Sequence, residues 1–261
     1  MSEYANYDDF NDENEPSEYD IKTGKENKVT AQKVIKKIFI YSLRIIAVAV
    51  FLILFWRLGS SKDTKLAKAF IWTEENISSY TENPSEFLAY KYMRQDNITK
   101  DGKFLVNNVY FVPSKNQFQI TLRYNNSTLK KLAEEYNLDN LPDGEAFVYA
   151  LTDNLGNVYS QYEYAVDKKN LYNYRRILFE NIDMQATKET VNKNGEKVIQ
   201  EFDSLYLNIY YKDDINFEKP YGVLQVYSND FYHEPMDLED YKTKNNKPNM
   251  ELKPGTSFIA E

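Results

Sequence analysis

Residues 38–56 read IFIYSLRIIAVAVFLILFW, a run of 19 residues that holds a single charge, and the rest of the chain divides around it. As an α-helix this run would rise about 28 Å, which is close to the ~30 Å hydrocarbon core of a bilayer. Arg44 leaves 12 uninterrupted apolar residues, 45–56, and lies about two helical turns from the Lys36-Lys37 end. Its side chain can therefore extend to the lipid headgroups. The run predicts a transmembrane helix over residues 38–58.

The flanking residues complete the predicted membrane anchor. Lys36 and Lys37 precede the run, while Tyr41 and Trp56 suit the aromatic belts at the two membrane interfaces. Two other interpretations stay open: the core helix of a soluble domain, and a cleaved signal peptide with Gly59-Ser60-Ser61 at the cleavage site. The 37 preceding residues, and the absence of an Ala-x-Ala sequence after the run, favour a retained anchor.

The distribution of basic residues predicts the orientation of this anchor. Six lysines lie in residues 21–37, whereas residues 57–73 hold four basic residues, and Arg44 raises the first count to seven. Because basic residues are enriched on the cytoplasmic side, we expect a cytoplasmic N-terminus and an extracytoplasmic C-terminal domain. The predicted location is the cell membrane, with a single span, and the lipid bilayer is the first predicted partner.

The segment before the anchor has the composition of an unfolded tail. Residues 1–20 hold eight acidic residues and no basic one, and residues 22–37 then become basic. Such a segment buries too little apolar surface to offset the entropy of ordering. We therefore expect residues 1–37 to form a disordered, acidic-then-basic cytoplasmic tail.

Residues 59–98 carry two helical patterns. Ser60-Ser61-Lys62-Asp63 has the form of a capping box, and apolar residues follow at helical spacing from Leu66 to Tyr80. Asn83-Pro84 is a second start signal, followed by Phe87, Leu88, Tyr90, Tyr92 and Met93. These patterns predict two short juxtamembrane helices.

From Asp101 the apolar residues recur every second position. The clearest alternation is FQITLRY at 118–124, and the other expected strands cover 104–112, 145–152, 158–164, 174–182, 204–211 and 221–227. A short helix is expected over 128–136, and Asn194-Gly195 predicts an additional hairpin within 187–202. About seven strands with turn residues between them predict a mainly β fold, an antiparallel Ig-like β-sandwich over 101–228. Residues 229–261 read as an extended C-terminal tail.

Composition excludes several classes of function. The net charge of −8 argues against nucleic acid as a partner, and the absence of cysteine excludes disulfide scaffolds and thiol nucleophiles. His233 is the one histidine, and no glycine-rich phosphate loop occurs. The acidic groups Asp213-Asp214 and Asp237, Glu239, Asp240 lack EF-hand spacing. We expect no catalytic residues, no cofactor and no metal.

Tyrosines cluster around one predicted hairpin, at Tyr159, Tyr162, Tyr164, Tyr172 and Tyr174. Tyrosine offers a large amphipathic contact at low entropic cost, which suits a surface that binds peptides or glycans. It is also a favoured residue of half-buried sheet faces. The cluster is therefore a candidate binding surface, with sheet packing as the alternative.

The short inner tail, the single span and strands such as YFVPSKNQFQITLRY (110–124) and EAFVYALTDNLGNVYS (145–160) resemble uncharacterised bacterial single-pass envelope proteins with an extracytoplasmic Ig-like domain. An anchor joined to a β domain without a catalytic constellation favours a non-enzymatic protein that binds another envelope protein or polymer, or assembles into an envelope complex. Two alternatives stay open: a signal transducer that acts through its cytoplasmic tail, and a membrane-tethered hydrolase that uses carboxylates.

Overall fold

The computed structural model describes residues 18–67, 69–92, 98–99, 101–142, 145–168, 172–214, 217, 219–238 and 248–256. Within the N-terminal helix, it describes the side chains of residues 32–56. The chain forms two compact units, residues 1–59 and 60–261. Each unit is described below on its own terms.

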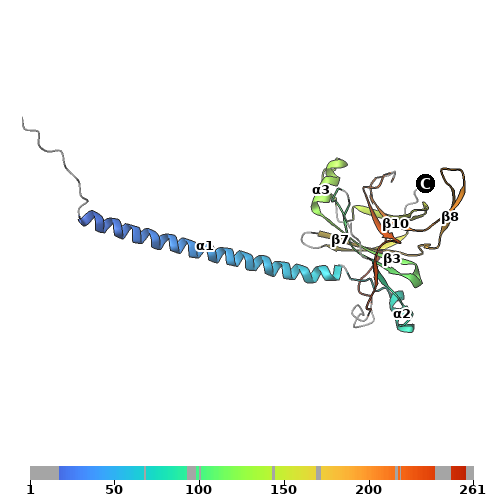
Figure 1. Ribbon diagram of the computed structural model, residues 1–261, viewed down its shortest axis with the longest axis horizontal. Helices are drawn as coiled ribbons and strands as arrows, with labels where there is room; N and C mark the ends of the chain where they lie inside the picture. The colour runs from blue at the N-terminus through green and yellow to red at the C-terminus, as the bar shows by residue number, and fades with distance from the viewer. Residues whose placement is uncertain are drawn as a thin grey trace, which may run out of the picture. The chain divides into compact units, whose positions relative to one another are not determined.

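Helix α1 (Glu18–Ala67) is a single α-helix of 50 residues, drawn as one uninterrupted coil in Figure 1. The predicted span, 38–58, lies inside it. Two expectations are wrong here: residues 18–37 are helical rather than disordered, and no new helix starts at the Ser60–Asp63 capping box. Extending an existing helix costs far less than nucleating one, and Lys, Glu, Gln and Ala are good helix formers. The expected disorder of residues 1–17 lies outside the described residues.

The segment that follows α1 forms one helix where two were predicted. Residues 70–73 are extended, and Thr73 caps α2 (Glu74–Glu82) by accepting a hydrogen bond from the backbone N–H of Asn76. Asn83-Pro84 does not start a second helix, because Pro84–Glu86 is a turn and Tyr90–Tyr92 is strand β1. The physical reason is pairing: β1 lies between two strands that satisfy its backbone on both sides.

The larger sheet has seven antiparallel strands. Its order is β12 (His233–Pro235), β1 (Tyr90–Tyr92), β2 (Leu105–Val112), β3 (Gln117–Asn125), β7 (Tyr172–Phe179), β6 (Tyr162–Lys168) and β13 (Lys253–Pro254). The 3-10 helix η1 (Pro113–Lys115) joins β2 to β3. The residues after 229 thus supply both edge strands of this sheet, so part of the expected tail belongs to the fold.

The smaller sheet has four antiparallel strands, in the order β11 (Gly222–Ser228), β10 (Ser204–Tyr211), β4 (Phe147–Asp153) and β5 (Val158–Tyr159). Residues 158–164, expected as one strand, split between the sheets: β5 pairs with β4, whereas β6 pairs with β7. A separate hairpin joins β8 (Thr187–Val191) to β9 (Lys197–Glu201), as the Asn194-Gly195 turn predicts, and Gly195 has φ +82°. Figure 1 shows it reaching out beside the two larger sheets.

One hydrophobic core takes side chains from both larger sheets. The larger sheet contributes Phe118, Ile120, Leu122, Ile177 and Phe179, and the smaller sheet contributes Tyr149, Leu151, Leu207, Ile209 and Leu224. Because alternate residues of a strand point to opposite faces, these positions define the inner face of each sheet. The predicted mainly antiparallel β architecture is confirmed. Helix α3 (Asn126–Glu135), expected at 128–136, lies at the opposite end of the β domain from α2 (Figure 1).

Candidate functional site

The predicted anchor is a helix long and apolar enough, by length and composition, to cross a membrane. The span covers Gln32–Trp56, 25 residues, and its most apolar window of 18 residues has a mean hydropathy of 2.7 and no buried side chain. Lys36, Lys37, Tyr41, Arg44 and Trp56 are all exposed on it. The guanidinium carbon of Arg44 lies 5.9 Å from the centre of the Tyr41 ring, one turn away. The Arg44 guanidinium therefore lies beside the Tyr41 ring.

The five tyrosines of the candidate binding surface do not form one exposed patch. Tyr162 and Tyr174 are buried, at 7% and 1% exposure, and Tyr162 packs against Phe179 in the core. Tyr159, Tyr164 and Tyr172 are half-buried and lie on three different strands. Burial removes Tyr162 and Tyr174 from any exposed surface, so packing explains these two residues.

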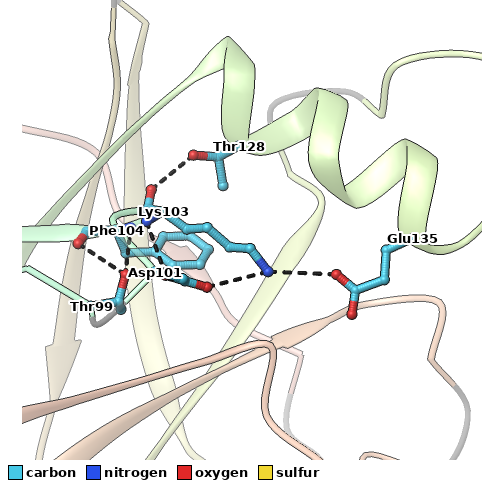
Figure 2. A network of polar contacts seen from close by, with 6 residues as sticks. All are labelled: Thr99, Asp101, Lys103, Phe104, Thr128 and Glu135. Carbon is cyan, nitrogen blue, oxygen red and sulfur yellow. Dashed lines mark hydrogen bonds and ion pairs between the residues drawn. The ribbon is translucent and has the colours of Figure 1, made fainter.

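A polar network surrounds Lys103 at the end of the β domain that carries α3 (Figure 2). The Lys103 ammonium lies 3.3 Å from an Asp101 carboxylate oxygen, 3.5 Å from a Glu135 oxygen and 3.7 Å from the centre of the Tyr221 ring. The Thr128 hydroxyl donates to the backbone carbonyl of Lys103, at 2.8 Å. The network therefore joins the loop before β2 to α3.

The electrostatics of this network keep Lys103 charged. Burial alone would lower the pKa of Lys103, but contacts with Tyr221, Asp101 and Glu135 outweigh it and raise that pKa above its ordinary value. A lysine that acts as a general base or nucleophile needs a lowered pKa. The Lys103 network is therefore suited to holding the loop and the helix together, and not to proton abstraction at neutral pH.

Asp101 gives the network a dependence on pH. Burial raises the pKa of its carboxyl, but hydrogen bonds from the Thr99 hydroxyl and the Lys103 backbone N–H outweigh burial and lower the pKa below its usual value. A carboxyl with a lowered folded-state pKa stabilises the fold above its unfolded pKa, and this stability is lost as the pH falls below about 4.

We therefore expect Asp101→Asn to reduce the free energy of unfolding slightly at pH 7 and to have a smaller effect at pH 3. Urea unfolding of the full chain in a mild detergent, followed by fluorescence at both pH values, measures the difference. Asp230→Asn, at an exposed turn position, is the control and should change stability equally at both. An Asp101→Asn effect of the same size at pH 3 would show that geometry, rather than charge, carries the contribution.

The other acidic and histidine candidates are engaged in packing and turn structure. The Tyr136 hydroxyl donates to Asp214 at 3.0 Å, and the Tyr211 hydroxyl donates to Asp213 at 2.9 Å. Burial and these hydrogen bonds raise the pKa of each tyrosine to about 12. His233 is exposed in β12, with its ring 5.3 Å from that of Tyr90. Asp237 is described, whereas Glu239 and Asp240 lie outside the described residues.

Hollows open beside β6, and two of them carry charged side chains from more than one element. The first, of about 410 Å³, contains the buried Arg176, and burial lowers the pKa of this residue to about 10, against the opposing effect of Asp167 in the same hollow. The second, of about 390 Å³, is acidic, with Glu74, Glu75, Glu163 and Glu180 in its lining. In the part of the chain that the structure describes, no three His, Asp or Glu side chains are grouped so that they could hold a metal ion.

Two side-chain amides clamp the extended segment Phe70–Trp72. Gln119 accepts from the Ile71 backbone N–H at 2.7 Å and donates to the Ile71 carbonyl at 3.0 Å. Asn249 donates to the Phe70 carbonyl at 2.7 Å and accepts from the Trp72 N–H at 3.1 Å. Each amide thus replaces a neighbouring strand along one edge of the segment, which we call the clamped segment.

The clamped segment covers the outer face of the larger sheet. Phe70 and Trp72 form a second hydrophobic cluster with Phe87, Tyr110 and Val112. Asn76 extends the polar contacts, donating to Gln117 at 2.9 Å and to the Ile71 carbonyl at 3.3 Å. The sequence predictions missed this clamp. The sequence did contain one indication of it: two uncharged amides, Gln117 and Gln119, occupy outward positions of the strand with the clearest alternation.

The outer face of the smaller sheet carries no charge at any of its ten alternating positions, although charged residues make up 28% of the chain. This uncharged face consists of the residues between those in the core, namely Val148, Ala150, Thr152, Val158, Ser204, Tyr206, Asn208, Tyr210, Val223 and Gln225. Gln225, Tyr206, Thr152 and Val158 lie directly opposite one another on successive strands and are all partly or fully exposed. Together they make an accessible row across the whole sheet.

The chain matches no known family model, no curated protein and no solved structure. Its function must therefore be argued from its own residues: an exposed apolar helix, a β domain with a well-paired Lys103 network, and an uncharged face.

Proposed function

We propose that this chain is a single-pass membrane protein that presents its β domain outside the cytoplasm and acts there by binding rather than by catalysis. The observation that carries the proposal is the span Gln32–Trp56. Within this span of 25 residues, a window of 18 residues has a mean hydropathy of 2.7 and no buried side chain, and a bilayer provides the apolar surroundings that such a helix favours. The basic residues before the span support the cytoplasmic N-terminus.

The β domain supports binding as its role in two ways. Lys103, which contacts Asp101, Glu135 and Tyr221, has a raised pKa, which is unfavourable for acid–base chemistry. Its smaller sheet offers an uncharged, partly exposed row that can bury surface against a partner without desolvating charges. On this proposal the two sheets form an Ig-like sandwich of a bacterial envelope protein, and its partner is another envelope protein or a polymer.

The absence of cysteine from the sequence allows a direct test of the topology. Ser2→Cys places a unique thiol near the N-terminus, and Lys193→Cys places one in the exposed β8–β9 turn. In intact cells, a membrane-impermeant maleimide should label the Lys193→Cys protein and not the Ser2→Cys protein. After permeabilisation both should be labelled, and the cysteine-free parent should stay unlabelled throughout.

The reverse pattern, with labelling at position 2 alone in intact cells, would overturn the proposed orientation. Labelling of neither protein before permeabilisation would place the β domain inside the cell. Recovery of either protein in the soluble fraction after high-salt washing would show that the span is not an anchor.

A further inference from the structure

The edges of the two larger sheets differ in how well they are protected against pairing with another strand. Three of the four edge strands are short: β12 has three residues and ends at Pro235, β13 is Lys253-Pro254, and β5 has two residues. Short length, proline and lysine are the usual devices that stop an edge from adding a strand. The fourth edge has none of them.

That fourth edge is β11, with the sequence GVLQVYS over Gly222–Ser228. It has seven residues, no charge and no proline, and its only strand neighbour in the described chain is β10. A bulge in its pairing with β10 falls opposite Leu205 and Tyr206, so regular pairing covers Gly222–Gln225. The outer side of β11 therefore presents backbone donors and acceptors that only another extended strand can pair in a regular ladder.

The charge of the protein indicates which partner this edge fits. The chain carries a net charge of −8, so two copies repel each other over most of their surfaces. β11 itself adds nothing to this repulsion, because it carries no charged residue, and Val223 and Gln225 extend the uncharged face to the edge of the sheet. An uncharged strand that meets its own copy places no like charges opposite each other.

We propose that two copies of this chain pair through β11, antiparallel and around a two-fold axis, so that two four-stranded sheets become one sheet of eight strands. A shared membrane would favour this pairing by confining both copies to one plane. The pairing itself depends only on the edge, so it stands independently of the orientation proposed above. Cyclic dimers are also the commonest symmetric assemblies of soluble chains.

The geometry of antiparallel pairing limits the possible registers. A two-fold axis perpendicular to the sheet keeps outward residues outward, so Val223 lies opposite either Val223 or Gln225 of the second copy. Opposed residues have Cα atoms about 4.5–5.5 Å apart, which a disulfide can bridge. Unique cysteines at these two positions therefore report both the pairing and its register.

The experiment is oxidative cross-linking of the full chain in its own membrane. Val223→Cys, Gln225→Cys and a co-expressed pair of the two carry the test. Val158→Cys is the matched control, because Val158 and Val223 lie on the two edges of the same sheet and are 45% and 47% exposed. We expect a cross-linked dimer of this chain from at least one of the three test arms, and only background from Val158→Cys.

A second variant connects the cross-link to the edge. Lysine at the other outward position of the protein that cross-links, namely Gln225→Lys with Val223→Cys, Val223→Lys with Gln225→Cys, or both in the co-expressed pair, adds the kind of charge that protects natural edges and should reduce the dimer to the level of the Val158→Cys control. Val158→Lys in the same protein should leave the dimer unchanged. An unchanged thermal melt confirms that the lysine variants fold, and threonine at the same position, which adds no charge, should retain the cross-link.

Three results would overturn the proposal: no dimer from any of the three test arms, equal dimer from Val158→Cys, or full cross-linking in the presence of the lysine on β11. A cross-linked product with a mass other than that of two copies would show that β11 takes an extended strand of a different protein, and would also overturn it.

Discussion

Replacing Tyr124 by phenylalanine is expected to lower the free energy of unfolding by about 1.5–3 kcal/mol, the cost typical of losing a hydrogen bond to a charged group. Arg175 lies on β7 and is 1% exposed, among the largest fully buried side chains that the structure describes. Its guanidinium donates to the Tyr124 hydroxyl at 2.7 Å and to the Tyr174 carbonyl at 2.9 Å. The substitution removes the shorter of these two hydrogen bonds.

The neighbouring Tyr149 provides a matched control for this prediction. Its hydroxyl is fully buried and has no hydrogen-bond partner among the residues that the structure describes, and burial raises its pKa well above the ordinary value. Tyr149→Phe removes an unsatisfied polar atom, so we expect no loss of stability and a gain of up to about 1–3 kcal/mol. The same chemical change should therefore have opposite effects at two tyrosines of one core.

A double-mutant cycle identifies Arg175 as the cause. Arg175→Met removes the buried charge but also takes this hydrogen bond from the Tyr124 hydroxyl, so it should itself cost about 1–3 kcal/mol. Tyr124→Phe should then cost much less in the Arg175→Met protein than in the parent. Urea unfolding of the full chain in detergent measures all four proteins. Equal costs of Tyr124→Phe in both backgrounds would show that the hydroxyl acts through another group.

The elements that the sequence predicted correctly are those whose core-facing positions are all apolar. Strands β3 and β10 alternate because their inner residues pack in the core shared by both sheets, and such a period is visible locally. Gly156 and Gly195 adopt φ of +89° and +82°, so the two turns that contain them required glycine. The local sequence was therefore sufficient to predict these strands and turns.

The wrong predictions concern segments whose conformation depends on distant partners. Tyr90–Tyr92 is a strand because it pairs with Val109–Phe111 and with His233–Pro235, and neither partner is visible in the local pattern. Asn83-Pro84 therefore looked like the start of a helix. Likewise, spacing placed Tyr162 and Tyr164 on one face of a strand, but only the packing of the second sheet made that face the inner one.

Replacing Gln119 by leucine is the second substitution with a large expected effect. It keeps the size of the side chain but removes the amide that pairs with both backbone groups of Ile71, which is 2% exposed. Two buried backbone groups that lose a partner cost about 1–3 kcal/mol each. The remaining contact, from Asn76 to the Ile71 carbonyl at 3.3 Å, satisfies only the acceptor. We expect a total loss of about 2–5 kcal/mol in the stability of the clamped segment.

The geometry of the clamp predicts which backbone amide exchanges its hydrogen faster after each substitution. Gln119→Leu should speed hydrogen exchange at the Ile71 amide most, whereas Asn249→Leu should act most on the Trp72 amide, because each side chain pairs with a different edge of the segment. Gln200→Leu, at an exposed position of β9, is the control and should leave both amides protected.

Tryptophan fluorescence gives a second measurement of the same opening. In a Trp56→Phe background, Trp72 is the remaining tryptophan, and its emission should shift to longer wavelength when the clamp opens. Equal exchange at both amides after either substitution would mean that the segment is held by Phe70 and Trp72 packing instead. The residue-specific result would show that the two amides hold the chain directly after α1 in place, since Ala67, the last residue of that helix, is only four residues before Ile71.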